Sequence, residues 1–244
     1  MKELYERYKY CVVQITVRTQ VGDLATGTGF HIGDGYIVTA RHVVEYHTIE
    51  SVARTYSSRK VTIKNIFYPS NSKIDLAVLE TDFSLDYYLE KTTIIEDGKP
   101  KEKVDRIPLG GHLDDWIGDE LVLSRVVAFG YPRIPLSKEY VLVAVQGEIN
   151  AVIDKYSGPH PHFVISTIVR EGVFGGPVIS EYDFLLGVLT ESLTDGDQAL
   201  ENGFASVISI EPLLVLLHEN KIRIRGNDNI LDEITGDSSS RHAR

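Results

Sequence analysis

The sequence predicts an all-β protein, built as a barrel or a sandwich. Residues 11–17 (CVVQITV) alternate apolar and polar side chains and are rich in β-branched residues, as half-buried strands are. Turns at Gly22-Asp23 and at residues 33–35 (GDG) separate this segment from two further strand-like runs, 25–32 and 36–40. Short strands at this spacing, joined by glycine turns, are typical of barrels and sandwiches.

Composition narrows the class of protein. The chain has 244 residues, which is enough for one large or two small domains with a sizeable core. A hydrophobic fraction of 43% with 25% charged residues is ordinary for a soluble globular protein. The net charge of -10 argues against a general nucleic-acid or anionic-membrane surface, because both need basic patches. We therefore expect no nucleic-acid partner and no membrane partner.

The N-terminus and the cysteine count indicate a compartment. Residues 1–10 mix charges with tyrosines and lack the apolar run of a secretory signal. No stretch approaches the roughly 20 apolar residues of a membrane span. Cys11 is the only cysteine, so no intramolecular disulfide is possible. These features favour a cytoplasmic protein.

The remaining elements follow from the same patterns. Residues 1–10 predict a short helix with an aromatic face, and residues 212–219 predict a helix with Pro212 in its first turn. Residues 82–105 are polar and fit an insertion, whereas the chain from about residue 225 is polar and is expected to be disordered. Further strands are predicted at 60–68, 74–80, 126–132, 141–149, 163–169, 178–180, 184–191 and 203–208.

Three motifs occur in a particular order along these elements. Residues 171–177 (EGVFGGP) lie between two β-branched runs and predict a strand, a tight glycine turn and a return strand. They resemble the nucleophile loop of trypsin-like serine peptidases, G-x-S-G-G-P. Residues 39–42 (TARH) resemble that family's T-A-x-H motif, and residues 75–79 (DLAVL) resemble its aspartate segment in bacterial members. One such motif would be weak, but all three stand in the family's order and in strand contexts.

The resemblance covers about residues 11–220 and implies a fold. It is strongest to small bacterial members without disulfides, similar to the protease core of the high-temperature-requirement enzymes. It implies two antiparallel six-stranded β-barrels with the site between them and a C-terminal helix. The expected division is residues 1–107 for the first barrel, 108–224 for the second barrel with its helix, and 225–244 for the tail.

The resemblance also assigns roles, and one of them conflicts with the residue present. His42 matches the general base, and Asp75 matches the carboxylate that holds its tautomer. The backbone N–H groups of Gly172 and Phe174 match the oxyanion hole. Phe174, however, occupies the position of the serine nucleophile and offers no oxygen for attack. Losing that serine typically lowers turnover on the order of a millionfold.

Three functions follow from that conflict. The first is a pseudopeptidase that binds a peptide or protein partner without cutting it. The second is a serine endopeptidase with a His-Asp-Ser triad, present here in a form inactivated by an introduced Phe174. The third, less favoured, is hydrolysis by another nucleophile, such as Ser166 or Thr167. The sequence leaves the partner and the oligomeric state open.

The resemblance further suggests where a ligand binds. A substrate-like peptide is expected to pair as an added strand along Leu189, Thr190 and Glu191. Ile168 aligns with the base of the primary specificity pocket, and the segment from Gly203 to Ala205 aligns with its wall. These residues predict a small or apolar side chain in that pocket.

Three other motifs suggest different functions, but each of them is weak. Residues 27–29 (GTG) suggest a dinucleotide loop, yet both flanks are predicted strands, and a strand with close backbone approach is favoured. His160 and His162 suggest a metal, but two ligands on a proline-rich loop without a third are insufficient. The triplet 236–238 (GDS) mimics a nucleophile motif beyond the predicted barrel. We therefore expect no cofactor and no metal.

Overall fold

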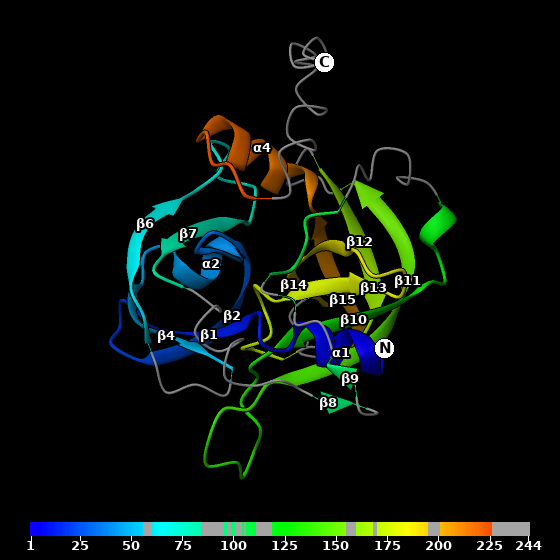
Figure 1. Cartoon of the computed structure of the whole chain (residues 1–244), viewed down its shortest axis with the longest axis horizontal. Helices are drawn as coiled ribbons and strands as arrows, with labels where there is room; N and C mark the ends of the chain where they lie inside the picture. The colour runs from blue at the N-terminus through cyan, green and yellow to red at the C-terminus, as the bar shows by residue number, and fades with distance from the viewer. Residues whose placement is uncertain are drawn as a thin grey trace.

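The computed structural model describes residues 1–55, 60–83, 95–96, 99–100, 104, 106–110, 119–154, 160–167, 170–194 and 201–225. Figure 1 shows two β units side by side, one formed by the first third of the chain and one by its second half. The predicted all-β class with a C-terminal helix is confirmed, and the two units are one closed barrel and one nearly closed barrel.

The first unit is an antiparallel sheet in the order β5-β4-β1-β2-β3-β7-β6. Only Thr62 separates β5 from β6 in the chain, although these strands lie at opposite ends of the sheet order, so the sheet nearly closes on itself. Counting β5 and β6 as one interrupted strand gives the six strands that were predicted. The strands are β1 (Val12–Arg18), β2 (Leu24–Gly33), β3 (Tyr36–Thr39), β4 (Thr48–Arg54), β5 (Lys60–Val61), β6 (Ile63–Phe67) and β7 (Ala77–Thr81).

The second unit is a closed six-stranded barrel in the order β10-β11-β12-β15-β14-β13. Its strands are β10 (Arg125–Gly130), β11 (Val143–Asp154), β12 (Pro161–Ser166), β13 (Pro177–Ser180), β14 (Leu185–Thr194) and β15 (Glu201–Ser209). β14 is much longer than β13, which pairs with it only up to Val188, whereas β15 pairs with it as far as Thr194. One edge of β14 therefore continues beyond its partner. A small separate ladder joins β8 (Ile95–Glu96) to β9 (Lys99–Pro100).

Both predicted helices are present. α4 (Glu211–Glu219) has Pro212 in its first turn and buries Leu213, Leu214, Leu216 and Leu217. α1 (Lys2–Tyr8) precedes the first barrel in the chain but packs on the second (Figure 1). Tyr5 stacks on Phe129 of β10 with ring centroids 6.2 Å apart, and the Tyr8 hydroxyl donates a 2.7 Å hydrogen bond to Asp183. α1 therefore ties the two barrels together.

Two further elements complete the described chain, α2 (Arg41–Val44) and a 3-10 turn, η2 (Asp119–Leu121). Within the described ranges, no helix has the length and apolar character needed to cross a membrane.

The segment 27–29 lies inside β2, where its glycines permit close packing. A Cβ at Gly27 would lie 2.3 Å from Val43 of α2, and a Cβ at Gly29 would lie 2.9 Å from the carbonyl oxygen of Val38. β2 pairs with β1 on one side and β3 on the other. The favoured prediction of a barrel strand with close backbone approach is therefore confirmed.

Candidate active site

His42 projects from α2, a single helical turn directly after β3. Ala40 caps the turn in an extended conformation, and Val43 and Val44 are buried beneath it. On the outer side of this helical turn, the guanidinium of Arg41 donates a 2.5 Å hydrogen bond to the carboxylate of Glu45. Because the apolar face of the turn is anchored in the barrel, the side chain of His42 points outward, with 47% of its surface exposed.

Asp75, just ahead of β7, binds His42 twice. Its Oδ1 accepts a 2.9 Å hydrogen bond from the His42 backbone N–H, and its Oδ2 lies 2.7 Å from the ring Nδ1. A carboxylate only accepts hydrogen bonds, so Nδ1 carries the proton and Nε2 is left as the basic nitrogen. Nε2 has no partner among the described residues. This is the geometry that a general base requires.

The Asp75 side chain is only partly buried, with 31% of its surface exposed. Water therefore reaches the His42–Asp75 pair.

The loop 171–176 adopts a glycine-dependent conformation between the barrels. Gly172 and Gly175 have φ values of +94° and +84°, which side chains rarely adopt. A Cβ at Gly172 would lie 2.4 Å from the Tyr131 carbonyl oxygen, and one at Gly176 would lie 1.9 Å from that of Phe129. Both distances are below any van der Waals contact. The loop therefore needs glycine for steric reasons as well as for its backbone angles.

Hydrogen bonds hold this loop on both sides. The carbonyl of Phe174 accepts from Thr28 N–H at 2.9 Å, and Gly175 N–H donates to the carbonyl of Leu189 at 2.8 Å. The buried hydroxyl of Thr28 also donates to the Gly172 carbonyl at 2.5 Å and accepts from Tyr131 N–H at 3.0 Å. Thr28 belongs to the first barrel and the loop to the second, so this threonine joins the two at the site. Sequence reasoning did not assign it a role.

The backbone N–H groups of Gly172 and Phe174 remain available as donors. Neither has a hydrogen-bond acceptor in the part of the chain that the structure describes. The carbonyls of the same two residues are occupied by Tyr131 and Thr28, which fixes the peptide planes on either side. The donors predicted for an oxyanion hole are thus uncommitted on a rigid loop.

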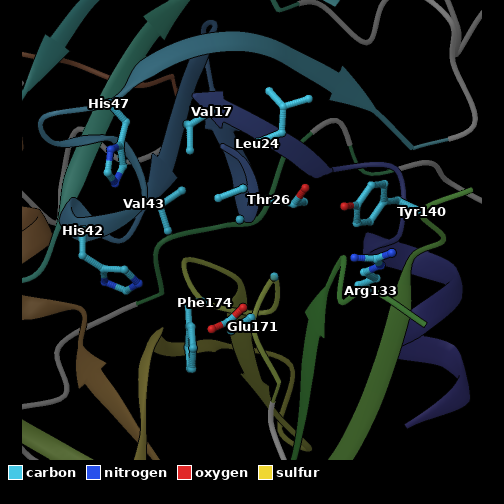
Figure 2. Close-up of a pocket in the computed structure, with 13 residues that line it drawn as sticks. Val17, Leu24, Thr26, His42, Val43, His47, Arg133, Tyr140, Glu171 and Phe174 are labelled. Carbon is cyan, nitrogen blue, oxygen red and sulfur yellow. The ribbon is translucent and has the colours of Figure 1, made fainter. Parts of the chain in front are cut away.

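The Phe174 ring stands beside the imidazole of His42. The two ring centroids are 5.7 Å apart with an interplanar angle of 69°, an edge-to-face arrangement. Figure 2 shows both side chains at one end of the same pocket. Such aromatic pairs contribute about 0.5–1.5 kcal/mol beyond simple burial. A hydrocarbon ring therefore occupies the position from which a nucleophilic oxygen would reach His42.

The residues expected to bind substrate differ in their burial and in their backbone contacts. Leu189 is buried and its backbone is bound to the nucleophile loop, and β14 continues beyond this contact to Thr194. Glu191 is exposed on this continuation. Ala205 is fully buried in β15, and Gly203 has φ +74°. Ile168 lies outside the described residues, as does the triplet 236–238.

The structure also describes the alternative nucleophiles and the two histidines that were considered as metal ligands. The Ser166 hydroxyl lies 3.3 Å from the backbone nitrogen of Glu148, across the β11–β12 ladder, and Thr167 is buried. His162 Nδ1 lies 2.9 Å from the carbonyl oxygen of His160. Within the described ranges there is no group of three or more metal-ligating side chains.

A pocket of about 430 Å³ opens next to His42 and Phe174. Its described walls come from the β1–β2 hairpin, α2, the nucleophile loop and the β10–β11 loop, and Figure 2 shows these side chains. The lining residues that lie outside the three motifs were not predicted, because no sequence pattern marks them. The lining residues are Val17, Leu24, Ala25, Thr26, Gly27, His42, Val43, His47, Arg133, Tyr140, Glu171, Gly172 and Phe174.

Two β-barrels with a His-Asp pair and a glycine loop between them define a serine-peptidase-type protein. The chain belongs to the trypsin-like peptidase domain family, whose model matches residues 27–188. No curated protein sequence matches it significantly.

Solved structures show the same fold. The HtrA-type protease AlgW with tripeptide is similar at a TM-score of 0.62 and 16% identity, covering 91% of this chain and 63% of AlgW. The Rv3671c protease from M. tuberculosis, active form, is similar at a TM-score of 0.59 and 21% identity, covering 91% of this chain and 84% of that protein. Its inactive form is similar at a TM-score of 0.56 and 20% identity, covering 89% and 92%. This chain thus spans less than two thirds of the length of AlgW.

Proposed function

We propose that this chain is a pseudopeptidase, a trypsin-like domain that binds an extended polypeptide without cleaving it. The observation that supports this is the packing of Phe174 edge-to-face against His42 at the nucleophile position. A phenyl ring has neither a proton for His42 to remove nor a lone pair to attack a carbonyl. Removing the triad nucleophile typically lowers turnover on the order of a millionfold, so cleavage falls to a negligible rate.

Binding, unlike cleavage, needs only features that remain in place. β14 runs on to Thr194, beyond Val188, the last residue with which β13 pairs. An extended peptide added there would form main-chain hydrogen bonds, as in other strand-addition complexes. The donors at Gly172 and Phe174 and the adjoining pocket extend this surface. Among the similar structures, AlgW holds a tripeptide.

The intact geometry around Phe174 favours a second candidate, an endopeptidase present in an inactivated form. His42 and Asp75 are paired at 2.7 Å, and the loop donors are free, so one side chain separates this site from a complete triad. In such an enzyme, His42 Nε2 would take the proton of a serine hydroxyl and Asp75 would stabilise the imidazolium.

Labelling with a fluorophosphonate probe tests both candidates. The chain itself is expected to show no labelling. Phe174→Ser is compared with Phe174→Ser/His42→Ala, which keeps the serine but removes its base. Labelling of the single variant alone supports an assembled site blocked by one ring. Labelling of neither variant indicates a long-diverged binding module, and labelling of the unchanged chain would refute the pseudopeptidase proposal.

A direct binding measurement tests whether the unchanged chain binds a polypeptide without cutting it. Fluorescein-labelled octapeptides from a positional library are titrated with the unchanged chain, and binding is followed by anisotropy. Saturable binding with the peptides intact after overnight incubation supports the proposal. Cleavage of the peptides into shorter fragments, or the absence of saturable binding, contradicts it.

A further inference from the structure

We propose that the pocket beside His42 and Phe174 selects a ligand segment in which an apolar side chain is followed by a carboxylate that Arg133 binds. This inference rests on the proposed function, because it names the chemistry of the polypeptide that the site takes. It concerns residues on the side of the site away from β14, and it assigns specificity to groups that no motif marks.

The inner part of the pocket is apolar. Val17 and Val43 are buried and face it from β1 and α2, and Leu24 covers it from the hairpin although 62% of its surface is exposed. Figure 2 shows these three side chains along one wall. Binding is favoured when a ligand removes an exposed leucine and the apolar wall beneath it from water. The inner pocket therefore suits an apolar side chain.

The outer end of the pocket is cationic. Arg133 and Tyr140, both from the β10–β11 loop, stand together there, apart from His42 and Phe174 (Figure 2). Arg133 is exposed and makes no ion pair with any described residue. Its guanidinium can donate two parallel hydrogen bonds to a carboxylate, a geometry in which Arg is favoured over Lys.

The two ends of the pocket carry opposite charges. Glu171 lines the end next to Phe174, and it too makes no ion pair with the described residues. A ligand carboxylate next to Glu171 would be repelled, whereas one at Arg133 would be attracted. Since the whole chain carries a net charge of -10, the attraction at Arg133 is local and opposed by the general field. The expected preference therefore depends on position, with an acid favoured only at the outer end.

The experiment uses the octapeptide of highest affinity from the library and three versions of it. The residue that follows the preferred apolar position is Asp, Asn or Lys, and each peptide is made with a free and an amidated C-terminus. The free and amidated forms distinguish a side-chain carboxylate from a terminal one. Binding is measured with the full chain and with Arg133→Glu and Lys138→Glu. Both variants reverse one charge in the same exposed loop, but Lys138 does not line the pocket.

The unchanged chain and Lys138→Glu are expected to bind a carboxylate peptide about tenfold more tightly than its neutral partner, the strength of one charge-assisted hydrogen-bonding contact. Arg133→Glu should abolish this difference and prefer the Lys peptide. An unchanged preference in Arg133→Glu, or an equal loss in Lys138→Glu, would overturn the inference while leaving peptide binding established. If no peptide in the library binds, the proposed function itself fails together with this inference.

Discussion

Replacement of Thr28 by Val tests the connection between the barrels at the site. Thr28 is fully buried, and its hydroxyl donates to the Gly172 carbonyl at 2.5 Å and accepts from Tyr131 N–H at 3.0 Å. Valine has nearly the same shape, so the change removes the hydrogen bonds and creates almost no cavity. The two backbone groups that contact Thr28 would then lose a partner in a site that water does not reach.

The expected loss in the free energy of unfolding follows from these two backbone groups, the Tyr131 N–H and the Gly172 carbonyl. Leaving a buried donor or acceptor unsatisfied costs about 1–3 kcal/mol. Tyr131 N–H and the Gly172 carbonyl also bond to each other at 3.2 Å, and this contact survives the substitution. The expected loss is therefore about 2 kcal/mol in total, near the lower end for two groups. For a chain of this size the loss lowers Tm by about 4–8 °C.

Urea unfolding followed by circular dichroism measures this loss. Thr26→Val is the matched control, because Thr26 lies on the same strand and its hydroxyl has no partner among the described residues. The control should stay within about 0.5 kcal/mol of the parent. If Thr28→Val also stays within that range, or if both variants lose the same amount, Thr28 does not hold the loop as described.

Three further outcomes are expected. Gly176→Ala should destabilise the chain by about 3 kcal/mol or more in urea unfolding, because its Cβ would lie 1.9 Å from a main-chain oxygen of β10; near-normal stability would contradict that packing. In the Phe174→Ser background, Asp75→Asn should slow probe labelling on the order of 10⁴-fold, since His42 would adopt the wrong tautomer; an unaffected rate would show that the carboxylate plays no part. The hydrogen bond from Arg41 lowers the pKa of Glu45 below its ordinary 4.5. The stabilisation from this pair, on the order of 0.5 kcal/mol, is therefore full above about pH 4.5 and lost as pH falls through the lowered pKa; Glu45→Gln should be less stable than the parent at pH 7, and the difference should disappear as pH falls below that lowered pKa.

The local alternation of apolar and polar residues was enough to predict most strands. It was not enough where a strand is irregular. Residues 60–68 were predicted as one strand, but the structure breaks it at Thr62, which donates its N–H to the Asp82 carboxylate at 2.6 Å. β4 was not predicted at all. It ends in Arg54, a buried cation that packs over the Phe83 ring at 5.5 Å, and a charged residue in the core obscures the apolar alternation.

The pocket beside His42 and Phe174 could not be predicted, for a different reason. Leu24, the first residue of β2, and Arg133, in the β10–β11 loop, are more than a hundred positions apart in the chain, and no motif marks either of them. They line one pocket only because the two barrels bring their loops together. No property of either segment alone indicates the other.

The sequence by itself determined the family, the antiparallel β class, the candidate roles of His42 and Asp75, and the absence of an oxygen at position 174. These depend on residue identity, on order along the chain and on local alternation. Only the tertiary structure decided that the His42 ring and Asp75 lie 2.7 Å apart, that Thr28 holds the loop, and that the Phe174 ring packs against the imidazole. These depend on how two barrels with distant sequences meet, and long-range packing leaves no local pattern in the chain.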